Sequence, residues 1–146
     1  MRILVDADAC PGKHMIEKAA SENNIDVIMY CDINHRLKSS YSDIKYVESG
    51  FQSVDMVIVN EVKKGDIVIS QDYGLAALVL GKKAYAISPK GYIYDNDNID
   101  RLLFERHVSG KIRRSGGKTF NPKKRMEEDD KRLYKNLMFL IDKAKK

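Results

Sequence analysis

Short apolar runs alternate with amphipathic segments along the chain. The apolar runs predict strands over 2–6, 27–30, 44–47, 67–70 and 84–87, with a smaller strand over 91–94. Apolar residues at helical spacing predict helices over 13–23, 72–80 and 124–144, and a further helix from residue 99 onward. Strands and helices that alternate in this way predict an α/β fold of three layers, in which helices cover both faces of a mostly parallel sheet.

Residues 54–62 fit two kinds of element. Their β-branched residues favour a strand, whereas their apolar residues also recur at helical spacing. Because 67–70 is a clear strand, a helix at 54–62 completes a βαβ unit, and we predict a helix. At the ends of other helices, we expect Gly81 to follow 72–80 in the C′ position and Asn98 to cap the next helix.

Length and composition indicate one domain. The chain has 146 residues, of which 43% are hydrophobic, so we expect a single domain over 1–146 with one core. No apolar run approaches the roughly 20 residues of a membrane span, and Asp6 comes too early for a secretory signal. Cys10 and Cys31 are too few for a disulfide framework. These features predict a cytoplasmic protein with free thiols, in which Cys10 is a small buried residue.

Charge is divided unequally along the chain. Residues 1–100 hold 11 Lys and Arg against 15 Asp and Glu, whereas residues 101–146 hold 15 Lys and Arg against 6 Asp and Glu. A basic segment beside an acidic body indicates a polyanionic partner, with RNA the leading candidate, and a solvated basic surface is the alternative. We expect this C-terminal third to dock on the body through the apolar face of the 124–144 helix.

Two acids directly follow the first predicted strand, in Asp6-Ala7-Asp8-Ala9-Cys10-Pro11. In extended chain, side chains two residues apart point to the same side, so we expect Asp6 and Asp8 to lie together. Asp72 follows the strand over 67–70 in the same way, and Asp55 begins the preceding helix. If these two strands are neighbours, the four carboxylates meet at the carboxyl edge of the sheet, where α/β proteins bind ligands. Such an oxygen-rich site suits Mg²⁺ or Mn²⁺.

The same acids have structural explanations. Asp55 and Asp72 suit helix N-termini because of the helix dipole, and Asp8 suits a turn. For Asp6 and Asp8 a functional role is the stronger interpretation, because two carboxylates this close repel each other unless a proton or a cation lies between them.

Basic side chains supply candidates for phosphate binding. These are His35, Arg36, Arg106, His107, Arg113, Arg114, Lys118, Lys123 and Lys124. Tyr41, Tyr73 and Phe120 are candidates for stacking on unpaired bases. The segment from Ser115 to Thr119 is not a phosphate-binding P-loop, because the first glycine of that motif and the strand before it are missing.

The sequence resembles the bacterial YaiI/YqxD family of uncharacterised proteins. The resemblance rests on the motif from Asp6 to Pro11 and on the segment over 65–76, and it extends to Asn98-Ile99, Arg106-His107 and the loop over 117–122. It therefore covers nearly the whole chain. The resemblance implies a relation to PIN-like domains, which are metal-dependent nucleases with a parallel sheet and an acidic pocket at its carboxyl edge.

The resemblance also implies roles for the acids. Asp6 matches the first-strand acid of such a pocket, Asp72 the acid after the fourth strand, and Asp55 the acid on the helix before it. Asp8 is an addition of the YaiI/YqxD family. Two features depart from the PIN-like pattern: the acid of an early helix has no good match, and Met56 stands where a second acid often follows.

Three functions are consistent with these residues. The preferred one is a Mg²⁺- or Mn²⁺-dependent nuclease or phosphodiesterase that acts on RNA, with metal held by Asp6, Asp8, Asp55 and Asp72. The second is an aspartyl-phosphate phosphatase with Asp6 as nucleophile and Asp8 as acid and base, although Cys10 stands where such enzymes carry Thr or Val. The third is a non-catalytic protein that binds RNA or the ribosome.

Overall fold

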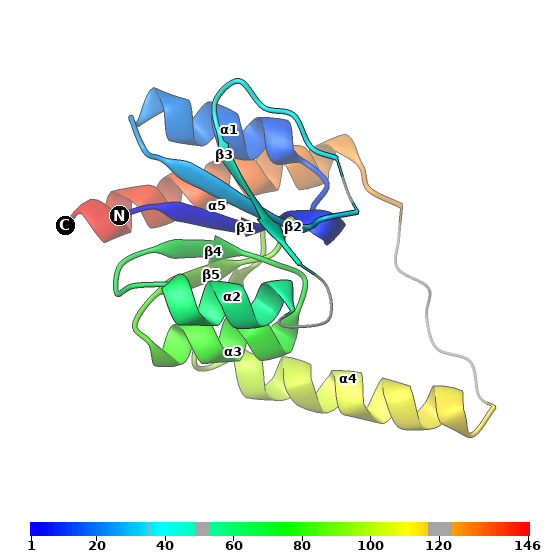
Figure 1. Ribbon diagram of the computed structural model, residues 1–146. Coiled ribbons are helices and arrows are strands. Elements are labelled where there is room, and N and C mark those ends of the chain that lie inside the picture. The colour runs from blue at the N-terminus through cyan, green and yellow to red at the C-terminus, as the bar shows by residue number, and fades with distance from the viewer. Residues whose placement is uncertain (35, 49–52, 117–123) are drawn as a thin grey trace.

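A six-stranded sheet forms the centre of the computed structural model, which describes residues 1–34, 36–48, 53–116 and 124–146 (Figure 1). The strand order is β3-β2-β1-β4-β5-β6. The strands are β1 (Ile3–Asp6), β2 (Val27–Asp32), β3 (Asp43–Val47), β4 (Ile67–Ile69), β5 (Tyr85–Ile87) and β6 (Ile93–Tyr94). The pairs from β3 to β5 are parallel and β6 pairs antiparallel with β5, which confirms a mostly parallel sheet.

Helices cover both faces of this sheet, so the three-layer α/β arrangement is confirmed. They are α1 (Lys13–Glu22), α2 (Val54–Glu61), α3 (Tyr73–Gly81), α4 (Ile99–Arg114) and α5 (Glu127–Lys145), with a 3-10 turn η1 (Ala7–Ala9). α1 and α5 lie on one face, and α2 and α3 lie on the other (Figure 1). The prediction of a helix for the ambiguous segment is confirmed, and Ser53 caps it by accepting a hydrogen bond from the Met56 N–H.

The core has two layers because strand side chains point alternately to the two faces. Ile3 and Val5 pack with Leu137 of α5, whereas Leu4, between them in sequence, packs with Leu75 of α3. All five side chains are buried. Burial on both faces explains why the strands are continuous apolar runs in the sequence.

One expectation about helix ends is wrong, and another is confirmed only in position, because α4 begins at Ile99 directly after Asn98 as predicted. Gly81 does not follow α3 but is its last residue, and the left-handed residue is Lys83, with φ at 66°. Asn98 precedes α4 without capping it through its side chain, because its Oδ1 accepts from the Asp95 N–H at 3.0 Å and its Nδ2 donates to the Ile93 carbonyl.

The C-terminal helix begins three residues later than the sequence predicts. Met126 is extended, with φ at −122° and ψ at 166°, and its N–H donates to the carboxylate of Asp129 at 2.9 Å. This bond satisfies a backbone group at the helix start, so α5 begins at Glu127 rather than at Lys124.

Gly91 allows α5 to approach the loop after β5. Its φ is +90°, which favours glycine, and a Cβ there would lie 2.5 Å from the backbone nitrogen of Leu133. Leu133 is fully buried between α5 and the sheet. A side chain at position 91 would therefore displace α5.

The helix α4 leaves the body of the molecule. Ile99 in its first turn is buried, whereas its distal turns extend away from the sheet (Figure 1) and Phe104 is 67% exposed. None of the helices in the described parts of the chain is both long and apolar enough to span a membrane.

Candidate active site

The neighbouring strands β1 and β4 bring two predicted acids to one edge of the sheet. The two strands pair in parallel, with Ile3 beside Ile67 and Val5 beside Ile69. Asp6 is therefore at the carboxyl end of one strand, while Asp72 follows the end of the other. The sequence predicted that these acids lie together if the two strands are neighbours, and the strands are neighbours.

Ser70 links the two acids. Its Oγ donates to Asp6 Oδ2 at 2.9 Å and accepts from the Asp72 N–H at 2.9 Å. The residue is 2% exposed, so water does not replace these bonds easily. Ser70 is not among the site residues predicted from the sequence, although its position between an apolar strand and Asp72 is a signal that it reaches the site.

Burial raises the pKa of Asp6, and the hydrogen bond from Ser70 opposes this shift only in part. The negative charges of Asp55, Asp8 and Asp72 raise it further. Four acids therefore affect one another electrostatically at this edge. Carboxylates in such surroundings favour a proton or a cation between them.

Asp55 and Asp72 form a pair. Burial, followed by a hydrogen bond and charge repulsion from Asp72, raises the pKa of Asp55. Burial also acts to raise the pKa of Asp72, but hydrogen bonds from Asp55 and from the N–H groups of Leu75 and Gly74 outweigh it and lower that pKa. Asp55, when protonated, thus donates to an ionised Asp72. The side chain of Asp72 also caps α3, so the structural explanation that the sequence offers for this acid applies as well.

Asp8 is held by a different element, although its negative charge acts on Asp6. The expectation of extended chain from Asp6 to Asp8 is wrong, because η1 turns the backbone at Ala7. The carboxylate of Asp8 accepts from the Asp32 N–H at 3.0 and 3.1 Å, at the end of β2. Its side chain therefore links η1 to the end of β2, which is a structural role different from the local turn that the sequence left open.

The acids suit a hard divalent cation by their chemistry. Asp6, Asp55 and Asp72 offer carboxylate oxygens from three separate elements, and repulsion between them is what a cation would relieve. Throughout the described ranges, no three His, Cys, Asp or Glu side chains already stand together closely enough to hold a metal ion. Metal binding at this edge thus requires side-chain rotation, with the Asp55–Asp72 hydrogen bond replaced by shared coordination.

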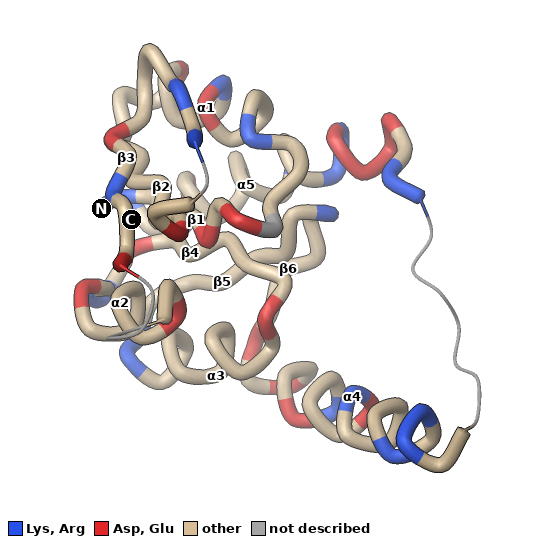
Figure 2. Tube along the Cα trace, turned by 45° about the vertical axis from the view of Figure 1, so that its right-hand side comes forward, with Lys and Arg blue, Asp and Glu red and all other residues tan. Residues whose placement is uncertain are grey.

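A basic cleft of about 410 Å³ adjoins Asp72. It is lined by Gly74 and Leu103 together with Arg106, His107, Gly110, Arg113 and Arg114. Arg106 also reaches Asp72, with 3.4 Å between Nη1 and Oδ1. Figure 2 shows Lys and Arg positions gathered in the distal turns of α4. Four predicted phosphate-binding residues therefore share one cleft beside the acids.

The other predicted binding residues do not join this cleft. Arg36 and Lys124 are exposed in segments outside it, and Tyr41 donates from its hydroxyl to the Ile25 carbonyl. His35, Lys118, Phe120 and Lys123 lie outside the described residues.

The cysteine beside the acids is not a reactive group. Cys10 is 3% exposed, and burial raises the pKa of its thiol to about 12, so the thiol stays protonated. Cys31 is also buried and free. The prediction of a small buried residue at position 10 is confirmed.

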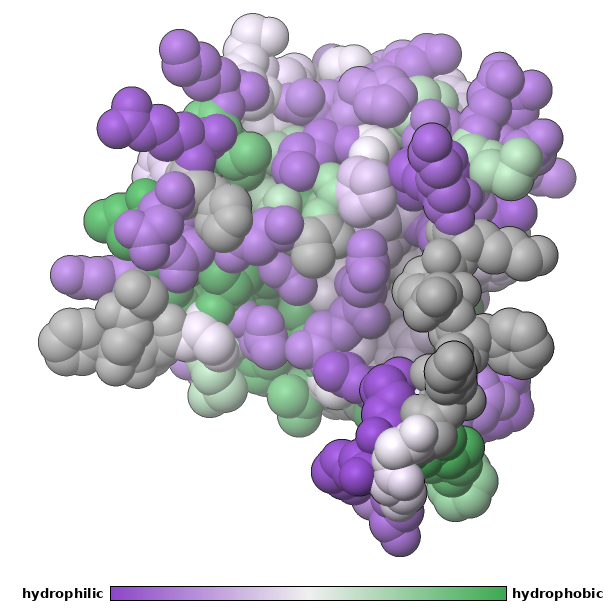
Figure 3. Space-filling view, turned by 90° about the vertical axis from the view of Figure 1, so that its right-hand side faces the viewer, coloured by the Kyte–Doolittle hydropathy of each residue, from purple (hydrophilic) through white to green (hydrophobic). Residues whose placement is uncertain are grey.

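The molecular surface at this edge is polar. Figure 3 faces the carboxyl ends of the strands, and hydrophilic side chains cover most of the visible surface there. The larger clefts elsewhere carry less of this chemistry: one lies between β3 and α2 around Lys45 and Glu61, which bond to each other. The acids and the basic cleft are therefore the chemically distinctive part of the molecule.

Comparison with known proteins places the chain among bacterial relatives. The family described as "Uncharacterized BCR, YaiI/YqxD family" matches residues 4–143. A "UPF0178 protein" of Clostridium tetani is 92% identical over 146 residues and is covered, like this chain, over 100% of its length. Relatives of the same description in Clostridium novyi and Clostridium acetobutylicum are 71% and 48% identical, each over 99% of this chain and over 97% and 99% of their own length. No solved structure matches the chain.

Proposed function

The chain belongs to the YaiI/YqxD family, and from this premise we propose that it is a divalent-metal-dependent hydrolase of phosphodiester bonds that acts on RNA. The observation that carries the proposal is the placement of Asp6 and Asp72 at the carboxyl ends of the neighbouring strands β1 and β4, with Asp55 hydrogen-bonded to Asp72. The basic cleft beside Asp72 supports a polyanionic substrate.

The acids would hold Mg²⁺ or Mn²⁺, with Asp6 and Asp72 as ligands from neighbouring strands and Asp55 as the third. A bound ion supplies an activated water and offsets negative charge on the reacting phosphoryl group. Ser70 holds Asp6 in its orientation, because the bond between them keeps one carboxylate oxygen fixed. Arg106 pairs with Asp72 in the absence of substrate and becomes a phosphate ligand when RNA enters the cleft.

The two other functions gain less support. An aspartyl-phosphate mechanism needs Asp8 beside the phosphoryl group on Asp6, whereas Asp8 is bound to the backbone of Asp32. A purely RNA-binding protein would use the basic cleft but gives no function to the carboxylates of Asp6 and Asp55, which Ser70 and Asp72 hold at the edge of the sheet.

The test is cleavage of single-stranded RNA of mixed sequence with Mn²⁺, Mg²⁺ or EDTA. We expect cleavage with metal and none in EDTA. Asp55→Asn should reduce the rate by more than the roughly 10- to 100-fold that outer partners of a metal contribute. Asp142→Asn, which neutralises an exposed carboxylate of α5, is the matched control and should keep full activity.

Each other outcome contradicts the proposal in a recognisable way. Equal cleavage by Asp55→Asn would assign the activity to a contaminant. A phosphoenzyme trapped on Asp6 would favour the aspartyl-phosphate alternative. Tight RNA binding that survives Asn at all four acids, with no cleavage by the wild type, would favour the binding protein.

A further inference from the structure

A second cleft lies beside Asp72 and is lined by the residues on either side of it in the chain. It has a volume of about 400 Å³, within the range typical of small-ligand sites. Its lining includes Gln71, Tyr73, Ser88, Lys90, Tyr92 and Tyr94. Gln71 and Tyr73 flank Asp72 in the chain. The cleft therefore adjoins the acids and presents aromatic rings where the basic cleft presents arginines.

Tyr94 and Tyr73 form fixed aromatic walls. Tyr94 is 4% exposed, and its hydroxyl donates to the Ser70 carbonyl at 3.2 Å. Burial raises the pKa of Tyr94, so this hydroxyl remains a donor. The ring of Tyr73 meets that of Tyr94 edge to face, with centroids 5.8 Å apart. Ser70 thus contacts both the acids and the aromatic cleft.

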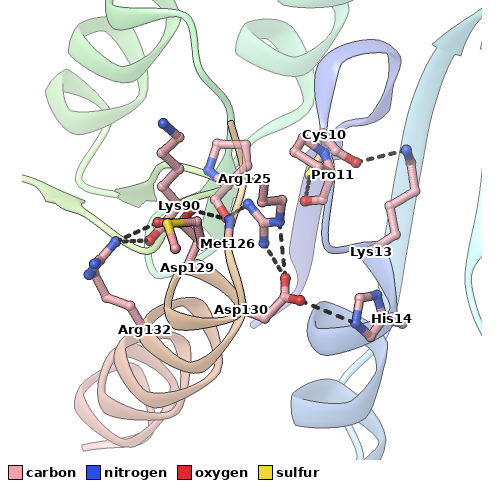
Figure 4. A network of polar contacts seen from close by, with 11 residues as sticks. Cys10, Pro11, Lys13, His14, Lys90, Arg125, Met126, Asp129, Asp130 and Arg132 are labelled. Carbon is pink, nitrogen blue, oxygen red and sulfur yellow. Dashed lines mark hydrogen bonds and ion pairs between the residues drawn. The ribbon is translucent and has the colours of Figure 1, made fainter. Parts of the chain in front are cut away.

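Tyr92 forms an exposed wall that α5 holds in place. It is 55% exposed, and the guanidinium of Arg132 lies 4.5 Å from its ring centroid. Figure 4 shows Arg132 fixed in turn by Asp129 and by the main chain at Lys90, with 3.0 Å for each bond. Nearby in the same view, Arg125, which precedes α5, donates a hydrogen bond to Asp130 in the first turn of that helix. The ring is therefore positioned before any ligand binds.

The chemistry of this cleft selects a flat ligand with polar edges. The exposed ring of Tyr92 offers a stacking surface, the more buried rings of Tyr73 and Tyr94 form the apolar wall beside it, and Gln71 and Ser88 give the rim of the cleft polar groups. Lys90 adds positive charge. An unpaired nucleobase of a phosphate-bearing strand has all of these properties.

The two clefts are arranged for one extended ligand. The neighbouring residues Leu102 and Leu103 of α4 line the aromatic and the basic cleft respectively, and Asp72 precedes α3 between them. A strand that crosses the start of α3 would thus place a base on the tyrosines and phosphates near Arg106.

We infer that the cleft formed by Gln71, Tyr73, Tyr92 and Tyr94 binds one unpaired nucleobase of an RNA strand next to the bond that is cleaved. This inference rests on the proposed function for the identity of the strand. The inference goes beyond the proposed function because it names the subsite that determines which phosphodiester bond of the RNA lies at the acids. Tyr73 is a stacking candidate already in the sequence, whereas Tyr92 and Tyr94 were not predicted.

The experiment measures binding of a four-nucleotide RNA that carries a single 2-aminopurine at each position in turn. The chain has no tryptophan, so the fluorescence of the base is read with little protein background. EDTA in the buffer prevents metal-dependent cleavage. We expect quenching at one position of the RNA. Tyr92→Ala should weaken binding by about 5- to 150-fold, the loss that one stacked base represents, whereas Tyr92→Phe should bind like the wild type.

Tyr46→Ala is the matched control, because Tyr46 is 46% exposed on β3 and does not line the cleft. It should leave both affinity and quenching unchanged. Thermal unfolding of every variant checks that Tyr92→Ala keeps its fold, and Tyr92→Leu, which keeps apolar bulk but removes the ring, provides the test if it does not.

Other results would overturn the inference. Equal affinities for the wild type and for Tyr92→Ala would do so, as would AMP binding as tightly as the RNA. Failure of the proposed function is separable. Quenching that depends on Tyr92 in a protein that cleaves nothing contradicts the nuclease alone, whereas metal-dependent cleavage that is indifferent to Tyr92→Ala contradicts the base subsite alone.

Discussion

Replacement of Ser70 by alanine tests how the acids are held. The substitution removes the hydrogen bond to Asp6 Oδ2 and the one from the Asp72 N–H, both 2.9 Å long, at a position that is 2% exposed. A hydrogen bond to a charged group contributes about 1.5–3 kcal/mol and a neutral one about 1 kcal/mol. We therefore expect Ser70→Ala to lower the free energy of unfolding by about 2–4 kcal/mol at neutral pH.

The pH dependence of this loss distinguishes the bond to Asp6 from general damage to packing. In the wild type the bond lowers the pKa of Asp6 against the stronger upward effect of burial. Its removal raises that pKa further. The contribution of the bond is present above the pKa of Asp6 in the folded protein and is lost as the pH falls through it, so the difference between the two proteins should shrink in acid.

Urea denaturation at a series of pH values gives this difference, and carbon NMR of the Asp6 carboxyl gives its pKa directly. Ser21→Ala, which removes an exposed hydroxyl that donates to the Lys18 carbonyl, is the control and should change neither quantity. A destabilisation by Ser70→Ala that is the same at every pH, or an Asp6 pKa that falls, would refute the reasoning.

Three further predictions concern charge, substrate and packing. Asp55→Asn should raise the midpoint of thermal unfolding at neutral pH, because the raised pKa of Asp55 means that its charged form destabilises the fold. This gain should vanish as the pH falls below the pKa of Asp55, and a lower midpoint at neutral pH would contradict the prediction. Arg114→Ala should reduce the slope of log affinity for RNA against log salt by about 0.7, whereas an unchanged slope would remove this residue from the basic cleft's phosphate contacts. Gly65→Ala should lower the free energy of unfolding by about 1–2 kcal/mol, because its φ of +86° disfavours a side chain. Gly91→Ala should lower it clearly more in urea denaturation, because the added Cβ also meets the backbone of α5, and equal losses would contradict this close approach.

The fold was predictable because its signals are local. Strands such as β1 and β4 are buried on both faces and therefore appear as continuous apolar runs, and they lie where the sequence predicts them. Boundaries were less predictable, because they depend on individual side chains. Asn98 bonds back to Asp95 instead of capping α4, and the carboxylate of Asp129 fixes the start of α5.

The site was predictable in outline only. Asp6 and Asp72 follow apolar strands, and the pairing of those strands brings them together. Their link through Ser70 is a tertiary hydrogen bond, and the bonds of Asp8 to Asp32 depend on the turn at η1, for which the sequence gives no periodic signal. The aromatic cleft joins Tyr73 to Tyr92 and Tyr94 across the sheet edge, and only the tertiary fold brings such distant positions together.

Calorimetric titration of Mn²⁺ tests the central claim most directly. The account predicts saturable binding by the wild type in the millimolar range or tighter, and loss of that binding in the double variant Asp6→Asn/Asp72→Asn, while Asp142→Asn binds as the wild type does. Mn²⁺ binding that is equal in the wild type and the double variant, or absent from both, would contradict a metal site at the carboxyl edge of the sheet.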